Sequence, residues 1–270
     1  MGRRRSSGIE AYKEREKTGR GIGFGSNYQP WLKTSDVTNS NGSRSRMYSL
    51  KCGRVIHFLS HAESQVFLTF DWMQDVVEIY EQMPLDPTVS MKVAEDLKVR
   101  HSGYTRKEGM VMTTDFVVRH KGRNGFWKEA IQVKSSPKDT ESKRTQEKLG
   151  IEEEYWRREG VNWRVIYASD LNPVFLRNLQ MLAPYRNARY SQKDLDCLMN
   201  YFLRVREAFP NADSTQLGQA VLSLIDDEEM TAWDVVAILT GKQLISCPIH
   251  DKNLFSCTLQ EFRPGYVSEE

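Results

Sequence analysis

The sequence predicts a mixed α/β core followed by a small winged-helix-like domain. Two observations support this. Between residues 47 and 170, apolar runs of strand length alternate with helical patterns, whereas the last hundred residues show mainly amphipathic helical spacing. The natural boundary lies at Leu171-Asn172-Pro173. We therefore expect two domains, residues 1–170 and residues 171–270.

The elements of the core can be placed in order. A hairpin is expected over residues 47–58, with its turn at Lys51-Cys52-Gly53. A helix should start after Ser60, which with Glu63 matches a capping box. A strand over 76–80 precedes a less regular stretch containing prolines, and further strands follow over 111–118 and 130–134. Asp139 or Thr140 should cap a long charged helix to Trp156, followed by a strand over 163–168.

The C-terminal region predicts three helices and a hairpin. The helices are expected over 192–209, from a Ser214 cap to residue 225, and from a Thr231 cap over 232–239. Residues 245–249 and 254–259 could pair across 250–253, which completes a winged-helix outline. The third helix contains no arginine, so we expect this domain to bind a protein partner rather than to read DNA.

Composition limits the class of protein. The 270 residues are 39% hydrophobic, which suffices for a large core, and no run approaches the roughly 20 apolar residues of a membrane span. The N-terminus is arginine-rich with no apolar segment behind it, so we expect a cytoplasmic protein without a secretory signal. The cysteines lack C-x-x-C spacing, so neither disulfides nor zinc are expected: Cys52, Cys197, Cys247 and Cys257.

Charge is distributed unevenly along the chain. Residues 211–270 hold ten acids against three cations, a net charge of −7. Because the whole chain carries +2, residues 1–210 carry +9. A basic body favours polyanions, and an acidic segment favours protein partners. The glycine-rich stretch 19–25 lies within a basic N-terminal segment, which we interpret as a flexible arm; a disordered tail without function fits the composition equally well.

A possible reactive site lies where two predicted strands end. Asp115 interrupts an apolar run, where a carboxylate is poorly placed unless it faces solvent at a sheet edge or has a partner, so we favour a functional role. Lys134 ends the next strand, and alternation places Gln132 on its side, opposite Ile131 and Val133. Carboxylate and amide oxygens, with the Val133 carbonyl, could hold a hard divalent cation, and a lysine could steady a phosphate. The sequence therefore suggests metal-assisted phosphodiester cleavage, although Lys134 and Gln132 could equally be solvated polar residues.

Glu63 is the candidate third member of the site. A helix packed on the sheet could present its carboxylate beside Asp115. A helix cap is the simpler explanation from local sequence alone. Loss of a cap should cost about 0.5 to 2 kcal/mol of stability, whereas loss of a metal ligand should abolish metal-dependent activity in a folded protein.

Four blocks of sequence resemble the TnsA family in order and spacing. They are Leu59-Ser60-His61-Ala62-Glu63, Met112-Thr113-Thr114-Asp115-Phe116, Ala130-Ile131-Gln132-Val133-Lys134, and Glu147-Lys148-Leu149 with Tyr155-Trp156. The resemblance implies a restriction-endonuclease-like core and a winged-helix-like C-terminal domain. It also implies the endonuclease subunit of a cut-and-paste transposase, which cuts the 5′ ends of the element while a DDE-class partner, TnsB, processes the 3′ ends.

The resemblance also implies roles for particular residues. Glu63 and Asp115 would bind Mg²⁺, with Mn²⁺ able to substitute, and Lys134 would be the catalytic lysine. Gln132 would stand where the wider nuclease superfamily has an acid. The C-terminal domain would contact TnsC, an ATP-dependent regulator. Candidate contacts to double-stranded DNA at the transposon ends, chosen from charge alone, are Arg3, Arg4, Arg5, Lys138, Lys143, Arg144 and Lys148.

Two other functions remain open from the sequence. An autonomous restriction or repair nuclease would cut DNA without a partner. A non-catalytic DNA-binding adaptor would use the acids only for structure.

Overall fold

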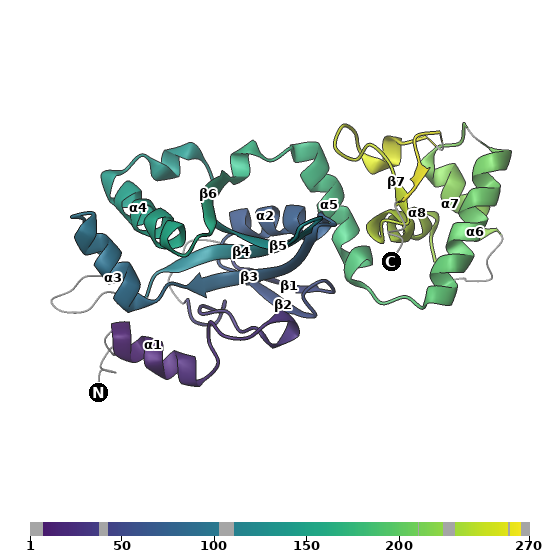
Figure 1. The fold of residues 1–270 in the computed structure, drawn as a ribbon. Helices are drawn as coiled ribbons and strands as arrows, with labels where there is room; N and C mark the ends of the chain where they lie inside the picture. Colours follow the sequence, from purple (N-terminus) through teal and green to yellow (C-terminus); the bar gives the residue numbers. More distant parts are fainter. Residues whose placement is uncertain are drawn as a thin grey trace. The chain divides into compact units, whose positions relative to one another are not determined.

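A computed structural model describes residues 8–37, 43–102, 111–209, 211–223, 230–258 and 260–265 (Figure 1). The chain divides into two compact units, Met1–Asp170 and Leu171–Glu270. In the described ranges, no helix combines the length and the apolar character that crossing a membrane requires.

The N-terminal unit is built on a four-stranded sheet with the order β3-β4-β5-β6. Its strands are β3 (Val76–Pro84), β4 (Thr113–Gly122), β5 (Gly125–Lys134) and β6 (Asn162–Tyr167). The first three are antiparallel, and β5 pairs with β6 in parallel. A parallel pair needs a crossover connection, which helix α4 (Lys143–Arg158) provides. The prediction of a mixed α/β core is confirmed.

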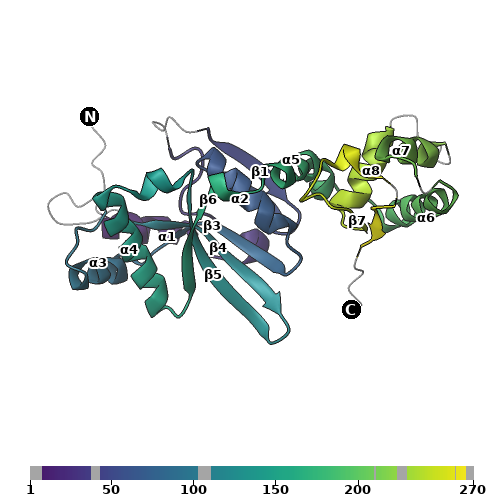
Figure 2. The ribbon, with the colours of Figure 1, turned by 90° about the horizontal axis from the view of Figure 1, so that it is seen from above.

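Helices cover both faces of this sheet (Figure 2). Phe116 of β4 packs toward Phe67 of α2 (His61–Trp72), with ring centroids 6.4 Å apart. Its neighbour Val117 belongs to a different core cluster, which contains Ile151 and Tyr155 of α4. Because successive strand residues point to opposite faces, α2 and α4 lie on opposite sides of the sheet.

A separate hairpin of β1 (Ser45–Ser49) and β2 (Arg54–Phe58) forms where the sequence predicts one. It is tied to β3 by a buried ion pair in which Arg54 Nη2 lies 2.6 Å from Glu81 Oε2. The same guanidinium nitrogen donates to the Ile79 carbonyl at 2.8 Å. A charged pair buried in this way is costly to break, so it fixes β2 against β3.

The segment after helix α1 (Gly8–Lys17) packs on the core, so the expectation of a flexible arm is wrong for residues 18–36. Tyr28 and Trp31, which follow the short 3₁₀ helix η1 (Gly25–Asn27), are both buried. Tyr28 Oη donates to the Glu81 carbonyl at 2.9 Å, and Trp31 N–H donates to the Gln82 carbonyl at 3.2 Å. Two buried aromatic residues thus anchor this glycine-rich segment to β3.

Two predictions within the core need correction. The proline-bearing stretch contains helix α3 (Pro87–Asp96), capped by the Asp86 carboxylate with proline in its first turn. Helix α4 is capped by Ser142, not by Asp139 or Thr140. Asp139 instead accepts backbone N–H groups from Ser135 and Ser136 in the short helix η2 (Pro137–Thr140), so its capping capacity is used one turn earlier. A last short helix, η3 (Ala168–Asp170), ends this unit.

The C-terminal unit is mainly helical. Its elements are α5 (Pro173–Asn187), α6 (Gln192–Ala208), α7 (Ser214–Leu222), α8 (Ala232–Gly241), η4 (Leu254–Ser256) and the two-residue strands β7 (Ile245–Ser246) and β8 (Arg263–Pro264). Thr231 caps α8 as expected, whereas Asp213, not Ser214, caps α7.

The predicted hairpin between 245–249 and 254–259 is wrong. Strand β7 pairs with β8, and residues 254–256 form a 3₁₀ helix capped by Asn253. The buried amide of Asn178 donates to the carbonyls of Ile249 and Lys252 and accepts from Leu254 N–H. These bonds take up the backbone groups that a hairpin would have used, so the expected wing does not form from these residues.

Candidate functional site

Two buried carboxylates meet where the N-terminus of α2 approaches one end of the sheet. Glu63, in the first turn of α2, is 6% exposed, and Asp115, near the start of β4, is 9% exposed. The amide nitrogen of Gln82, on β3, lies 3.1 Å from Asp115 Oδ1 and 3.5 Å from Glu63 Oε2. The structure therefore brings together two acids far apart in the chain and places a hydrogen-bond donor between them.

Asp115 sits where the β4–β5 ladder ends. The register between these strands ends at Phe116↔Ile131. Beyond that pair, Asp115 Oδ2 accepts the backbone N–H of Val133 at 2.8 Å. The carboxylate thus replaces a backbone partner of β5, which explains how an acid is tolerated inside an apolar run.

Glu63 both caps its helix and faces the acidic pair. Ser60 Oγ accepts from Glu63 N–H at 3.2 Å, and Glu63 Oε2 accepts from Leu59 N–H at 2.9 Å. The other oxygen, Oε1, accepts the Ser60 hydroxyl at 2.8 Å. The capping explanation and the site explanation therefore describe the same side chain, and the cap fixes the direction in which the carboxylate points.

Gln132 and Lys134 share one side of β5, as strand alternation requires, whereas Ile131 and Val133 are buried on the other. The Gln132 Oε1 atom is buried and has no hydrogen-bond partner within the described residues. Lys134 lies close enough to lower the pKa of Asp115, yet in the described part of the chain its ammonium makes no ion pair. The Lys134 cation therefore acts on Asp115, and an unpaired acceptor lies two residues before this lysine on the same side of β5.

Burial dominates the electrostatics of the site. It raises the pKa of Glu63 to about 8, and repulsion from Asp115 adds to the effect. Burial also raises the pKa of Asp115, opposed by the Lys134 charge and by the hydrogen bond from Val133. Both acids therefore resist carrying their negative charges together, a conflict that a bound cation would relieve.

Glu152 of α4 is a third buried acid, at 3% exposure, although the sign alternation along that helix suggests a solvated surface. Its Oε1 accepts from Thr114 Oγ1 at 2.8 Å and from Trp163 Nε1 at 2.9 Å. Burial raises the pKa of Glu152 to about 8, with a further contribution from Asp115. Its one sequence signal is its place among Ile151, Tyr155 and Trp156 on the buried stripe of the helix.

Gln82 is the functional candidate that sequence reasoning missed. It is 2% exposed and has φ of +49°, a left-handed conformation unusual for a residue other than glycine. Thr113 Oγ1 donates to its amide oxygen at 2.9 Å, which directs the amide nitrogen toward the carboxylates. Strained backbone of this kind is concentrated at functional sites. No local pattern in the sequence marks this glutamine.

The candidate DNA contacts have different surroundings. Arg3, Arg4 and Arg5 lie outside the described residues. Lys138, Lys143 and Lys148 are exposed, whereas Arg144 is partly buried. Arg144 pairs with Glu147 and donates to the carbonyls of Arg100 and His101, so it joins α4 to the segment after α3. The assignment of these cations to DNA stays a prediction.

The donor set suits a hard cation with few protein ligands. In the described ranges, no group of three or more His, Cys, Asp or Glu side chains is arranged to hold a metal ion. The two carboxylates of Glu63 and Asp115 and the unpaired amide oxygen of Gln132 are all oxygen donors, and Mg²⁺ binds through one or two carboxylates while keeping several waters. These residues therefore fit such an ion.

The fold and the site define a nuclease-type α/β domain. A model of the TnsA-like endonuclease N-terminal domain family matches residues 73–168, which include Asp115, Gln132 and Lys134 but not Glu63. The Escherichia coli transposon Tn7 transposition protein TnsA is 40% identical over 168 residues, which is 62% of this chain and 60% of that protein. Residues 73–168 are therefore similar to the N-terminal domain of TnsA-like endonucleases, and the chain is similar to the Tn7 protein over part of its length. The match thus spans about 60% of the length of that relative.

The buried acids should make the stability of the metal-free protein depend on pH. For Glu63 and Glu152, pKa values near 8 exceed the ordinary value of 4.5, so their contribution to stability is complete below about pH 4.5 and is lost as the pH rises through about 8. We expect urea unfolding in a metal chelator to show Glu63→Gln more stable than the wild type at pH 8, by about 1 kcal/mol or more.

The matched control is Glu153→Gln, which removes an exposed charge from α4. Its stability should follow the wild-type pH curve. If the Glu63→Gln and wild-type curves run parallel from pH 5 to pH 8, burial and the Asp115 charge do not raise the pKa of Glu63 in the folded protein.

Proposed function

We propose that this protein is the Mg²⁺-dependent DNA endonuclease subunit of a cut-and-paste transposase. The observation that carries the proposal is the buried Glu63–Asp115 pair bridged by Gln82, with the Lys134 charge acting on Asp115 and the unpaired Gln132 oxygen on the same side of β5 as Lys134. The TnsA-like endonuclease match over residues 73–168 supports the reaction class. Hydrolysis at the 5′ ends of the element, with a DDE-class partner acting on the 3′ ends, is the finer form of the proposal.

Glu63, Asp115, the Gln132 amide oxygen and the Val133 carbonyl would hold the cation, Mg²⁺ or Mn²⁺. When bound, such an ion supplies Lewis-acid activation of the phosphodiester and of the attacking water. The Val133 N–H and the Gln82 amide keep the Asp115 carboxylate in one orientation. The cap at Ser60 does the same for Glu63. Both acids are therefore held in place before any ligand arrives.

Lys134 would act on the scissile phosphate. Its ammonium lies near Asp115 without an ion pair in the described residues, so it can contact an incoming phosphate oxygen. A fixed positive charge in this position stabilises the negative charge that develops on the phosphate during attack by water. Because Gln132 is neutral where an acid would add a charge, the site should bind its cation more weakly than a site with three carboxylates.

Reconstituted excision with separate scoring of the two strands tests the reaction. We expect Lys134→Ala and Asp115→Asn to lower 5′-strand cleavage by at least about a hundredfold, because each removes charge at the reacting phosphate or cation. Joining of the 3′ ends should continue. Lys92→Ala, which changes an exposed lysine on α3, is the control and should cleave normally.

The same assay separates the other two functions. Efficient cleavage by the protein without its transposase partner would identify an autonomous nuclease. A folded Asp115→Asn protein that still supports 5′ cutting would identify a non-catalytic DNA-binding adaptor.

A Gln132→Glu variant tests the metal assignment through binding. The new carboxylate adds negative charge to the ligand set, so calorimetric titration should show tighter Mg²⁺ binding than in the wild type. The same charge should destabilise the metal-free fold, so added Mg²⁺ should raise the melting temperature of the variant by more than that of the wild type. Equal affinities would show that Gln132 does not face the cation.

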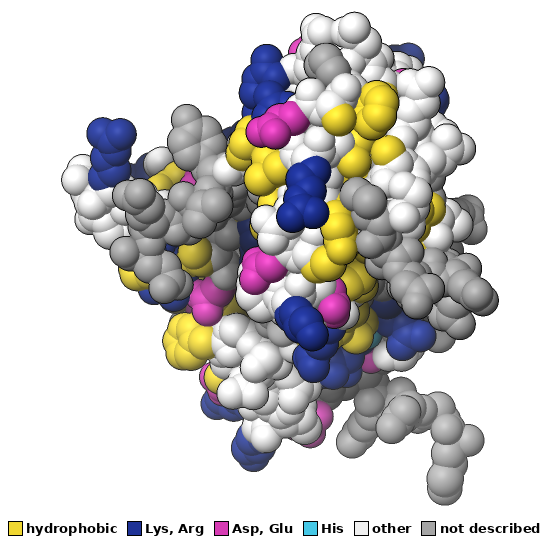
Figure 3. Space-filling model, turned by 90° about the vertical axis from the view of Figure 1, so that its right-hand side faces the viewer, with side chains coloured by type: hydrophobic (Ala, Val, Ile, Leu, Met, Phe, Trp, Pro, Cys, Tyr) yellow, Lys and Arg dark blue, Asp and Glu magenta, His cyan; other side chains and the backbone are white. Residues whose placement is uncertain are grey.

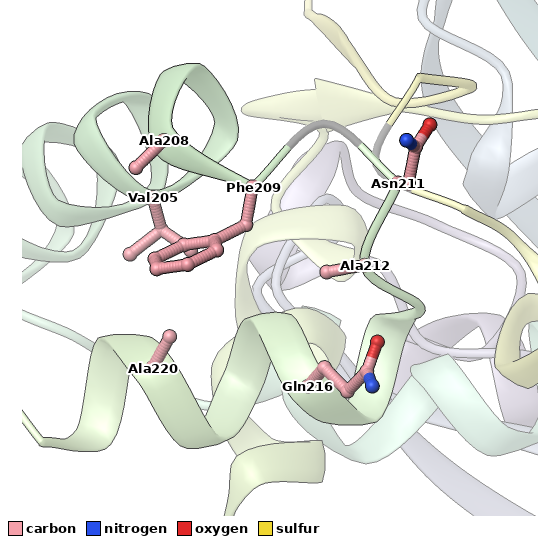
Figure 4. A pocket seen from close by; sticks show the side chains of 7 residues that line it. All are labelled: Val205, Ala208, Phe209, Asn211, Ala212, Gln216 and Ala220. Carbon is pink, nitrogen blue, oxygen red and sulfur yellow. The ribbon is translucent and has the colours of Figure 1, made fainter.

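We further propose that the C-terminal unit binds a protein, in family terms the TnsC-like ATP-dependent regulator. The winged-helix outline stays a prediction. A pocket of about 570 Å³ opens between α6 and α7 (Figure 4), and Phe209 at its rim is 59% exposed. Hydrophobic side chains also gather in several groups among charges of both signs on the face in Figure 3. The pocket is lined by Val205, Ala208, Phe209, Asn211, Ala212, Gln216 and Ala220.

The chemistry of this pocket favours a peptide over DNA. None of its lining residues is charged, and residues 211–270 carry a net charge of −7, which repels phosphate. A partner peptide with an apolar side chain flanked by basic residues would suit both the uncharged pocket and the negative charge around it.

A Phe209→Asp variant of the full chain tests this docking. It should lose binding to the regulator ATPase in a pull-down while retaining the wild-type affinity for DNA, because only the apolar pocket is changed. Leu203→Asp is the control, since Leu203 lies on the same helix, is 37% exposed and does not line the pocket. Equal loss with both variants would show that the pocket is not the docking site.

A further inference from the structure

The outer part of the β4–β5 hairpin, residues 119–128, carries an unusual set of side chains. It contains four cations, Arg119, Lys121, Arg123 and Lys128, and no acid. Residues 121–128 are all exposed. Figure 2 shows the two strands running out together past helices α2 and α4. We call residues 119–128 the hairpin tip.

Two large aromatic side chains are exposed on the hairpin tip. Phe126 is 56% exposed and Trp127 is 47% exposed. Both rings are held by contacts with neighbouring side chains. The Arg119 guanidinium lies 4.0 Å from the centroid of Phe126, and Trp127 stacks on His120 with centroids 3.9 Å apart and planes within 4°. His120 is itself buried between Asp75 and Glu129, so the structure holds the indole in place while leaving nearly half of it in water.

Three of the four cations share one face, and three of the four make no ion pair within the described residues. The register pairs Lys121 with Phe126 and Arg119 with Lys128, so these four side chains share a face of the hairpin. Arg119 pairs with Glu78 at 3.0 Å. Within the described residues, Lys121, Arg123 and Lys128 make no ion pair. Lys121 and Lys128 thus flank the Phe126 ring on one face, whereas Trp127, paired with His120, lies on the other face.

The hairpin tip stands at a defined place relative to the acidic site. Asp115 and Lys121 are six residues apart on the same strand, roughly 20 Å at about 3.3 Å per residue. On β5, Phe126 and Lys128 have the same parity as Gln132 and Lys134, and the register of that strand is unbroken. A duplex along this face would meet the hairpin tip about six base pairs from Asp115, at about 3.4 Å per base pair.

We propose that the hairpin tip is a second DNA-binding element, which binds duplex DNA about six base pairs from the phosphodiester cut beside Asp115. This proposal rests on the proposed function for the identity of the reacting strand. Lys121, Arg123 and Lys128 contact phosphates, and Phe126 lies against the sugars and base edges of a groove. The interiors of protein interfaces are depleted of lysine, whereas clustered exposed cations bind the phosphates of duplex DNA.

Salt-dependent binding of the full-length protein to a labelled linear duplex, in a metal chelator so that no strand is cut, tests the proposal. The triple variant Lys121→Gln, Arg123→Gln, Lys128→Gln should bind more weakly. The slope of log K against log salt is negative, by about 0.9 for each phosphate contact. The loss of three contacts should therefore make the slope less steep by about 3. Phe126→Ala should weaken binding without changing the slope, because the ring carries no charge and so neutralises no phosphate.

A second triple variant with the same charge change, Arg177→Gln, Lys193→Gln, Arg204→Gln, removes exposed cations of the C-terminal unit and should keep the wild-type slope. All substituted side chains are exposed, so melting temperatures should match the wild type. If the two triple variants have the same affinity and slope, or if the hairpin variant loses only binding to the transposase partner, the proposal is overturned.

The outcome is separable from the nuclease assignment. Asp115→Asn should bind the duplex with the wild-type salt slope but fail to cut it. A hairpin variant that loses binding, beside an Asp115→Asn protein that still cuts, would support the hairpin tip and refute the catalytic site. The reverse pattern would support the catalytic site alone.

Discussion

Repulsion between two buried carboxylates is the constraint around which the N-terminal unit is organised. Glu63 and Asp115 are both almost fully removed from water, and burial together with their mutual repulsion raises the pKa of Glu63 to about 8. Such a pair persists only when the surrounding structure holds it in place. The Gln82 amide supplies a donor between the two acids, and the end of the β4–β5 ladder supplies another at Val133. The positions of these donors are set by the sheet.

Strand β3 connects this constraint to the rest of the unit. Glu81 holds the β1–β2 hairpin through its buried ion pair with Arg54, and the next residue, Gln82, turns its amide toward the acids. The left-handed backbone of Gln82 is held on one side by Trp31, whose N–H binds its carbonyl. The N-terminal segment, the hairpin and the acidic pair are therefore linked through two consecutive residues. Strain at Gln82 is sustained because its neighbours fix it from several directions.

Charge distributes the proposed roles along the chain. The acidic site needs a cation to neutralise it, the hairpin tip presents cations of its own to DNA, and the acidic C-terminal region offers an uncharged pocket to a protein. The first two of these proposed roles follow from clustered charge attracting its opposite, and the third follows from an apolar surface in a region of negative charge.

The sequence by itself determined the elements whose pattern is local. Alternation along 130–134 placed Gln132 with Lys134, the capping box started α2, and the misplaced acid Asp115 marked the site. Only the tertiary structure decided which side chains meet. No local pattern marks Gln82, and the alternating charges around Glu152 favour an exposed position for it. In both cases a distant element buries the side chain, which the neighbouring residues in sequence do not indicate. The prediction of the C-terminal hairpin was wrong for the same reason. Short apolar runs fit strands or helices equally, and hydrogen bonds from Asn178, over seventy residues away, favour the 3₁₀ helix at residues 254–256.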